Sequence, residues 1–164
     1  MISAIYDSPI GKFTLVSNGK ALTHLDFETT RTPAPQHPCG SDKVLDKAHR
    51  ELDAYFEGKL KQFTVPVDPQ GTEFQRKCWA ALQKIPYGAT RSYAQQAVAI
   101  GNPKAVRAVG LANGRNPIAV IIPCHRVIGS DGSLTGFGGG LPRKRFLLGL
   151  EAGEGGDLLL MTGS

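Results

Sequence analysis

The pattern of the sequence changes at Pro69-Gln70-Gly71. Before this point, apolar and polar residues alternate in three short segments, which are residues 2–7, 12–17 and 21–27. Alternation with a period of two is typical of half-buried strands, and short turns such as Asn18-Gly19 connect antiparallel neighbours. We therefore expect an antiparallel meander at the start of the chain.

A helix is expected to follow this meander. Ser41 is placed to cap it, and Gly58 is placed to end it. Between them an apolar stripe recurs with helical spacing, formed by Leu45, Ala48, Leu52, Tyr55 and Phe56. The stretch from there to residue 71 has no period and is interpreted as a linker.

After the linker the sequence favours helices. Thr72 and Gln75 have the spacing of a capping box, and Ser92 and Gln95 repeat it. The first of these helices carries Cys78 on its apolar stripe, so we interpret Cys78 as a core thiol.

The second capping box begins a helix-turn-helix pattern. A first short helix is expected over residues 93–100, Gly101-Asn102 supplies a tight turn, and Pro103 suits the first position of a second helix that runs to about Ala112. The chain is thus predicted to be a two-domain α+β protein. Residues 1–70 form a small N-terminal domain of antiparallel sheet and helix, and residues 71–164 form a mainly α, winged-helix-like C-terminal domain.

The charge is divided between these two parts. Residues 1–73 hold eight Lys/Arg and ten Asp/Glu, a net charge of −2, whereas residues 74–164 hold eleven and four, a net charge of +7. Between Phe74 and Arg145 the only acidic residue is Asp131. A surface of nearly one sign attracts polyanions, although many basic surfaces are simply solvated. The second helix of the helix-turn-helix carries Lys104 and Arg107, which favours nucleic acid.

The composition indicates the cellular compartment and disfavours membrane contact and metal binding. Three widely separated cysteines, no signal-peptide pattern and no apolar run near the length of a membrane span predict a cytoplasmic protein with reduced thiols that makes no membrane contact. The histidines His24, His37 and His49 have no ligand spacing with any cysteine, so no metal site is expected.

The chemistry is expected at Pro123-Cys124-His125-Arg126-Val127. An apolar run precedes this segment and a glycine-rich segment, residues 129–140, follows it. A proline fixes Cys124, and the two residues after it can stabilise a thiolate. This pattern indicates a presented, reactive thiol rather than a packing cysteine.

Together these residues resemble the O6-alkylguanine-DNA alkyltransferase family. The resemblance rests on residues 123–127, on Asn116-Pro117 and Arg107-Ala108-Val109-Gly110 before them, and on Glu151 after the glycine-rich loop. It covers residues of about 72–152 motif by motif and residues 1–70 more loosely. It implies a ribonuclease H-like N-terminal domain and a single-turnover enzyme without a cofactor.

The implied reaction moves the alkyl group from O6 of guanine in duplex DNA onto the protein's own cysteine after the base is flipped out. The partner would be double-stranded DNA containing O6-alkylguanine. Action on O4 of thymine, and cooperative assembly of the expected monomer on DNA, are left open.

The resemblance also implies roles for individual residues. Cys124 would accept the alkyl group, His125 would take its proton through a water, and Glu151 would orient His125. Asn116 would tie the DNA-binding helices to the active-site loop. Substrate-binding roles fall to Tyr93, Asn113, Val127, Phe137 and Gly138, and DNA-binding roles to Lys104, Ala105, Arg107, Ala108, Gly110 and Arg126.

Three positions depart from common family patterns. Phe137 stands where many relatives have tyrosine, Gly138 replaces a hydroxyl-bearing residue of some members, and Asn113 stands where others have methionine. The nucleophile and its relay are intact, so catalysis is expected, but the range of alkyl adducts is left open.

Two other classes compete with this hypothesis. A Cys-His thiol hydrolase usually has its histidine far from the cysteine in sequence. A helix-turn-helix regulator, or a protein that binds lesions without repairing them, would not need the thiol; non-catalytic relatives replace that cysteine, and Cys124 is present.

Overall fold

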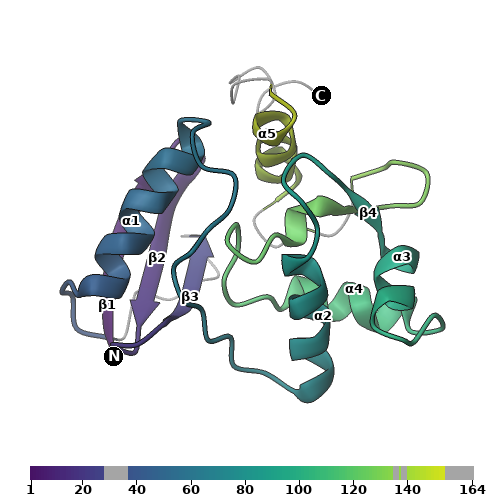
Figure 1. Ribbon diagram of the computed structural model, residues 1–164, viewed down its shortest axis with the longest axis horizontal. Helices are drawn as coiled ribbons and strands as arrows, with labels where there is room; N and C mark the ends of the chain where they lie inside the picture. The colour runs from purple at the N-terminus through teal and green to yellow at the C-terminus, as the bar shows by residue number, and fades with distance from the viewer. Residues whose placement is uncertain (28–36, 135–136, 138–139, 154–164) are drawn as a thin grey trace. The chain divides into compact units, whose positions relative to one another are not determined.

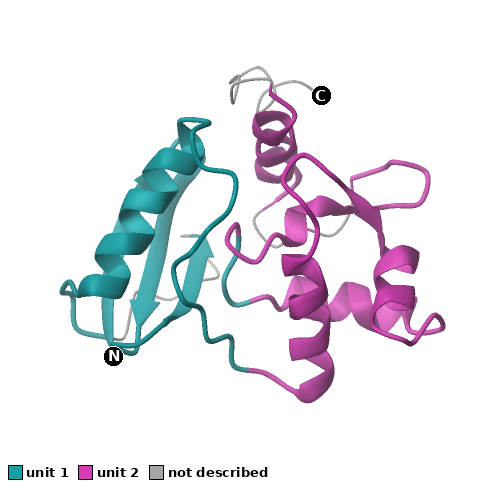
Figure 2. Ribbon diagram, in the orientation of Figure 1, with its two compact units in different colours: residues 1–70, 117–119 teal, residues 71–116, 120–164 magenta. Residues whose placement is uncertain are grey.

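The computed structural model describes residues 1–27, 37–134, 137 and 140–153. The chain divides into two compact units (Figure 2). Unit 1 comprises residues 1–70 and 117–119, and unit 2 comprises residues 71–116 and 120–164. Each unit is described by itself.

Unit 1 is a three-stranded antiparallel sheet with one helix. The strands β1 (Ile2–Ser8), β2 (Gly11–Ser17) and β3 (Leu22–Phe27) pair in sequence order, as the alternating pattern predicts. Helix α1 (Lys43–Phe56) covers one face of the sheet (Figure 1). Its apolar stripe packs on buried side chains of the strands, so the core of unit 1 lies between sheet and helix.

The cap of α1 differs from the prediction by one residue. Asp42, not Ser41, is the N-cap, and its carboxylate accepts a hydrogen bond of 2.7 Å from the backbone N–H of Leu45. The other oxygen of Asp42 accepts a 2.7 Å bond from the hydroxyl of Ser17 on β2. A carboxylate can serve both donors at once and favours the positive end of the helix dipole, which explains the choice of Asp42.

Unit 2 is mainly helical. Its helices are α2 (Glu73–Gln83), α3 (Tyr93–Ala99), α4 (Val106–Gly114) and α5 (Leu141–Glu151) (Figure 1). Both predicted capping boxes form, at the start of α2 and at the start of α3. Two short strands, β4 (Arg91–Ser92) and β5 (Val127–Ile128), pair in parallel, and a 3₁₀ turn, η1 (Cys124–Arg126), precedes β5.

The core of unit 2 fixes α2 against α4. Cys78 is fully buried on α2, in agreement with its interpretation as a core thiol. Beside it, the indole N–H of Trp79 donates a 2.9 Å hydrogen bond to the backbone carbonyl of Ala112 on α4. A buried indole that finds its acceptor on a neighbouring helix fixes the register of the two helices.

The second helix of the helix-turn-helix begins later than predicted. Pro103 does not open α4; the backbone N–H of Ala105 donates to the carbonyl of Asn102 at 3.0 Å, which closes a turn, and Ala105 is the N-cap. Proline and asparagine suit the first two positions of such a turn as well as proline suits a helix start. Lys104 therefore lies in the turn.

Candidate active site and nucleic-acid interface

The predicted nucleophile lies at the start of a tight turn. Cys124 opens η1, where the backbone N–H of Val127 donates to the Cys124 carbonyl. In an extended chain the side chains of Cys124 and His125 would point apart, and the 3₁₀ turn removes this alternation. Cys124 is partly exposed, while His125 is fully buried. Cys124 as a residue is therefore partly open to solvent, whereas the imidazole of His125 is shielded.

His125 forms a buried pair with Glu151 at the end of α5. Its Nε2 lies 2.7 Å from Oε2 of Glu151. Among the described residues, Nδ1 of His125 is the buried side-chain nitrogen without a hydrogen-bond partner. The carboxylate thus holds one ring nitrogen and leaves the other able to exchange a proton.

The charge of Glu151 is stabilised by two neighbours. Burial alone would raise the pKa of this carboxyl, but the charges and hydrogen bonds of His125 and Arg126 lower it to about 2. Glu151 is therefore ionised throughout the neutral range and supplies a fixed negative charge beside the imidazole.

Arg126 does not serve as the predicted DNA contact. Its side chain is buried, and its Nε and Nη2 donate to the Glu151 carboxylate at 2.7 and 3.0 Å. Its Nη1 donates to the backbone carbonyl of Ile85 at 2.7 Å. The cause is the buried carboxylate of Glu151, which needs a charged hydrogen-bond donor as its partner. Arg126 links α2, η1 and α5.

Asn116 lies between the end of α4 and the loop that leads to the nucleophile. Its Nδ2 donates a 2.7 Å hydrogen bond to the carbonyl of Ile122, two residues before Cys124. Burial raises the pKa of the Cys124 thiol, while a hydrogen bond from the Asn116 side chain and the charge of Lys144 oppose this rise. Net, the pKa stays raised, so the resting thiol is mostly protonated.

Lys144 is a site residue that sequence reasoning missed. This side chain on α5 is 0 % exposed, and its Nζ donates a 2.6 Å hydrogen bond to the carbonyl of Val127. Burial lowers the pKa of Lys144, and the negative form of Cys124 raises it. In the sequence the run Arg143-Lys144-Arg145 suggests a solvated basic face. The available signal was the spacing of seven residues from Lys144 to Glu151, which puts both on one face of a helix.

The residues with predicted substrate roles are only partly brought together. Tyr93 is the first residue of α3, and its ring lies against Gly110 of α4, where an added Cβ would be 3.8 Å from the ring. Phe137 is half-buried, and Gly138 lies outside the described residues.

Asn113 does not present a free amide to a substrate. Its Nδ2 donates to Oε1 of Gln96 at 2.7 Å, and Nε2 of Gln96 donates back to Oδ1 of Asn113 at 2.9 Å. Gln96 also donates to the carbonyl of Cys78 at 3.1 Å. Because both polar groups of Asn113 are used in this buried pair, its role is to join α3 to α4.

The predicted DNA-binding residues of the helix-turn-helix lie at the surface. Lys104, Arg107 and Ala108 are exposed, and Ala105 and Gly110 are half-buried. The opposite side of α4 is buried in the core of unit 2. α4 therefore presents small and cationic side chains on its open side, together with two exposed apolar residues, Val106 and Leu111, and its cations favour the approach of a polyanion.

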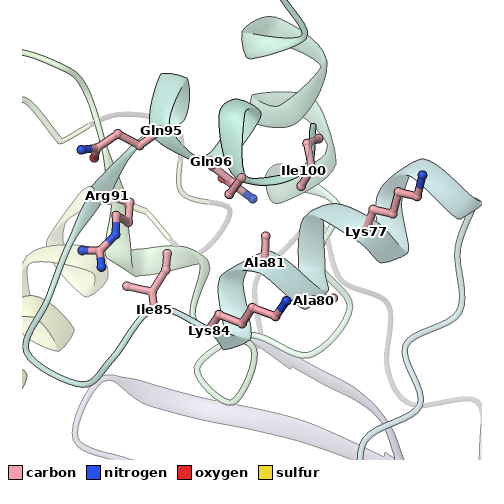
Figure 3. A pocket seen from close by; sticks show the side chains of 10 residues that line it. Lys77, Ala80, Ala81, Lys84, Ile85, Arg91, Gln95, Gln96 and Ile100 are labelled. Atoms are coloured by element: carbon pink, nitrogen blue, oxygen red, sulfur yellow. The ribbon is translucent and has the colours of Figure 1, made fainter. Parts of the chain in front are cut away.

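A separate groove of about 530 Å³ lies between α2 and α3 (Figure 3). Three cationic side chains, Lys77, Lys84 and Arg91, line it together with alanines and isoleucines of the two helices. None of the predicted catalytic residues lines this groove. We interpret it as part of the basic surface of unit 2 and not as the site of the reaction.

Two further findings concern metal binding and membrane spans. Within the described parts of the chain, no cluster of three His, Cys, Asp or Glu side chains could hold a metal ion. No helix in these parts is long and apolar enough to cross a membrane.

Comparison with known proteins matches both parts of the chain. Residues 73–153 match the DNA-binding domain of 6-O-methylguanine DNA methyltransferase, and residues 1–69 match the ribonuclease-like domain of the same proteins. The methylated-DNA–protein-cysteine methyltransferase of Methanosarcina barkeri is 55% identical over 149 residues, which are 90% of this chain and 94% of that protein. The protein of the same name from Mycobacterium tuberculosis is 54% identical over 146 residues, 88% of each chain.

Solved structures agree with the sequence matches. The crystal structure of Mycobacterium tuberculosis OGT in complex with DNA aligns with a TM-score of 0.91 at 48% identity and covers 99% of both chains. An O6-methylguanine DNA methyltransferase from Methanococcus jannaschii aligns with a TM-score of 0.65 at 26% identity and covers 91% of this chain and 93% of that chain. With its ribonuclease-like sheet unit, its helical DNA-binding unit and a cysteine beside a buried His–Glu pair, this chain belongs to the 6-O-methylguanine DNA methyltransferase family.

Proposed function

We propose that this chain is a methylated-DNA–protein-cysteine methyltransferase that repairs O6-alkylguanine in duplex DNA by moving the alkyl group onto Cys124. The observation that carries the proposal is Cys124, a partly exposed residue that directly precedes His125 in η1, where His125 forms a buried pair with Glu151 and its Nδ1 is unpartnered. A proton can leave the thiol toward Nδ1, directly or through a water, while Glu151 stabilises the imidazolium that results.

The reaction balances within the protein and the damaged base. The Cys124 sulfur attacks the alkyl carbon, an S–C bond forms, and the C–O6 bond breaks with its electron pair left on the guanine. The guanine anion takes a proton, for which protonated His125 is the nearby source. The product thioether is stable, so each molecule acts once.

A hydrogen bond and a positive charge support the thiolate. The amide of Asn116 and the charge of Lys144 both lower the pKa of Cys124 against the effect of burial. Lys144 also holds the Val127 carbonyl, which immediately follows the nucleophile turn. We assign Lys144 a double role, as counter-charge of the thiolate and as a positioning residue for the loop.

The DNA-binding face is assigned to α4 and the start of α3. The target atom is inside the base stack, so the base must be extruded before the thiol can reach it. Arg107 is exposed on α4, and Tyr93 lies against Gly110 beside it. We assign Arg107 to the space that the flipped base vacates and Tyr93 to the entrance of the pocket.

The test measures the conversion of O6-methylguanine to guanine in the DNA. A duplex with one O6-methylguanine is incubated with the protein and digested to nucleosides, which are separated by chromatography. The proposal expects O6-methyl-2′-deoxyguanosine to disappear and unmodified 2′-deoxyguanosine to increase by an equal amount. Cys124→Ala, which keeps the DNA-binding surface, should leave the lesion intact. If Cys124→Ala still restores guanine, the proposed nucleophile is wrong.

A further inference from the structure

Leu111 is an unusual residue on the exposed side of α4. It is 67 % exposed, the largest exposed fraction among the large apolar side chains of the described residues. A single exposed leucine elsewhere on a surface would need no explanation. Here it is on the helix that the basic surface presents, and every other exposed residue of the stretch from 107 to 115 is small or cationic.

The helical period places Leu111 between two cations. Arg107 lies four residues before it and Arg115 four residues after it, and both are exposed. Positions four apart on a helix are neighbours on one face. A large apolar group is thus flanked by two exposed guanidinium groups on the helix assigned to the DNA-binding face.

The surface beside Leu111 is shaped by a close helix contact. Gly110, its neighbour in sequence, lies under the ring of Tyr93, so α3 and α4 meet there. Leu111 is thus on the helix that meets Tyr93, one turn after Arg107, and its side chain is exposed. Nothing in the stretch Phe74–Arg145 except Asp131 is acidic, which disfavours an ordinary basic partner and favours a duplex as the occupant.

We infer that Leu111 is an apolar wedge that contacts the base step next to the lesion and helps to unstack it, a role that rests on the proposed function. Leucine is one of the side chains that DNA-bending proteins insert between base steps, at the cost of unstacking. The rate of repair then depends on the base step beside the lesion.

The spacing on α4 sets which base step is contacted. Four helical residues rise by about 6 Å. Neighbouring bases are about 3.4 Å apart along one strand. Leu111 therefore reaches a step one or two bases from the one that Arg107 occupies. Flexible pyrimidine–purine steps at this place should help repair, and stiff A-tracts should hinder it.

The test compares Leu111→Ala with the unchanged protein in single-turnover repair. Alanine is a strong helix former and the site is exposed, so the variant should fold. Ile5→Ala is the matched control, because it also truncates an exposed apolar residue, 44 % exposed on β1 of unit 1. The substrates are O6-methylguanine duplexes with a TA step or an A-tract beside the lesion, and free O6-benzylguanine.

A wedge predicts a selective loss. Leu111→Ala should lower the repair rate of the A-tract duplex by about fivefold to tenfold, in line with the contact area of one leucine. The repair rate of the TA duplex should fall less. Reaction with the free base should be unchanged, as should all rates of Ile5→Ala. The slope of log binding constant against log salt should equal that of the unchanged protein, because no cation is lost.

Three results would overturn the inference. These are an unchanged duplex rate, an equal loss on duplex and free base, and a duplex loss that does not depend on the flanking step. If the unchanged protein reacts with none of the three substrates, the result contradicts the proposed function and does not concern the role of Leu111.

Discussion

Cys124 experiences opposing effects from its neighbours. Burial raises the pKa of the thiol, whereas Asn116 and Lys144 lower it, and the raised value means that a proton must be removed when the substrate arrives. A thiol that stays protonated at rest is protected from oxidants, since the thiolate is the reactive form. In the proposed reaction, the His125–Glu151 pair supplies the base at the moment of transfer.

Replacing Lys144 tests its contribution at this scale. Lys144→Met removes the positive charge and keeps the length of the side chain, so the pKa of Cys124 should rise further. The rate of Cys124 alkylation by iodoacetamide, measured by mass spectrometry of its peptide, should fall at neutral pH by about tenfold and recover at higher pH.

Lys84→Met is the control for Lys144→Met, because it makes the same substitution at a lysine that is exposed and not buried. Its pH profile should match that of the unchanged protein. An unshifted profile for Lys144→Met would contradict a role in thiolate stabilisation, and would leave only the hydrogen bond to Val127 as the function of this side chain.

The residues that sequence could not assign are those whose partners are distant in the chain. The sequence places Arg126 and Asn113 near the site, but nothing local reveals that Arg126 is paired with Glu151 and Asn113 with Gln96. Lys144 was missed for the same reason. A buried charge is recognised by its partner, and the partner becomes visible only in the folded chain.

At the scale of elements, local signals worked where side chain and backbone interact within one turn. Both capping boxes form as predicted, because their hydrogen bonds span only three residues. The start of α4 was missed because Pro103 fits a turn and a helix start equally well, and the choice depends on packing of α4 against α2.

Arg107 is the second residue of α4 and is exposed at its N-terminal end. Arg107→Ala should slow single-turnover repair of a methylated duplex by about a hundredfold. Without the arginine, no side chain fills the gap that the extruded base leaves in the stack. Reaction with free O6-benzylguanine should change by less than about twofold, since no stack must be opened.

The control for Arg107 is Lys77→Ala on α2, which removes an exposed cation outside the proposed helix-turn-helix contact. Equal losses on duplex and free base in Arg107→Ala would remove this residue from base flipping. A loss of the same size in Lys77→Ala would show that charge alone controls the rate.

At the scale of the whole molecule, the two parts of the chain differ in the sign of their net charge. The whole positive excess belongs to residues 74–164, which carry a net charge of +7 and include the helix-turn-helix, whereas residues 1–73 carry −2. The binding constant for duplex DNA should therefore fall steeply as salt rises, by about tenfold or more between 50 and 200 mM, because phosphate contacts release counterions. Fluorescence anisotropy of a labelled duplex measures this, and a flat response would contradict phosphate contacts.

The His125–Glu151–Arg126 cluster predicts how stability depends on pH. The pKa of Glu151 is about 2 in the folded protein against an ordinary value of 4.5. A lowered folded pKa contributes stability in full above about pH 4.5, and this contribution is lost as pH falls toward 2. Acid unfolding followed by fluorescence of Trp79, the only tryptophan, should show this loss.

Glu151→Gln isolates that contribution. The variant should be less stable than the unchanged protein at neutral pH by about 3 kcal/mol, because it leaves buried charge without its partner. Its free energy of unfolding should also depend less on pH between 4.5 and 2. If the two proteins have parallel profiles in this window, the titration of Glu151 does not control the acid limb.

The central claim is transfer to one thiol, once per molecule, and intact-mass spectrometry tests it most directly. The protein is mixed with excess O6-methylguanine duplex and weighed after the reaction stops. We predict a gain of one methylene unit in every molecule, located on the peptide that contains Cys124 and absent in Cys124→Ala. Unchanged protein mass with continued loss of the lesion would contradict the account.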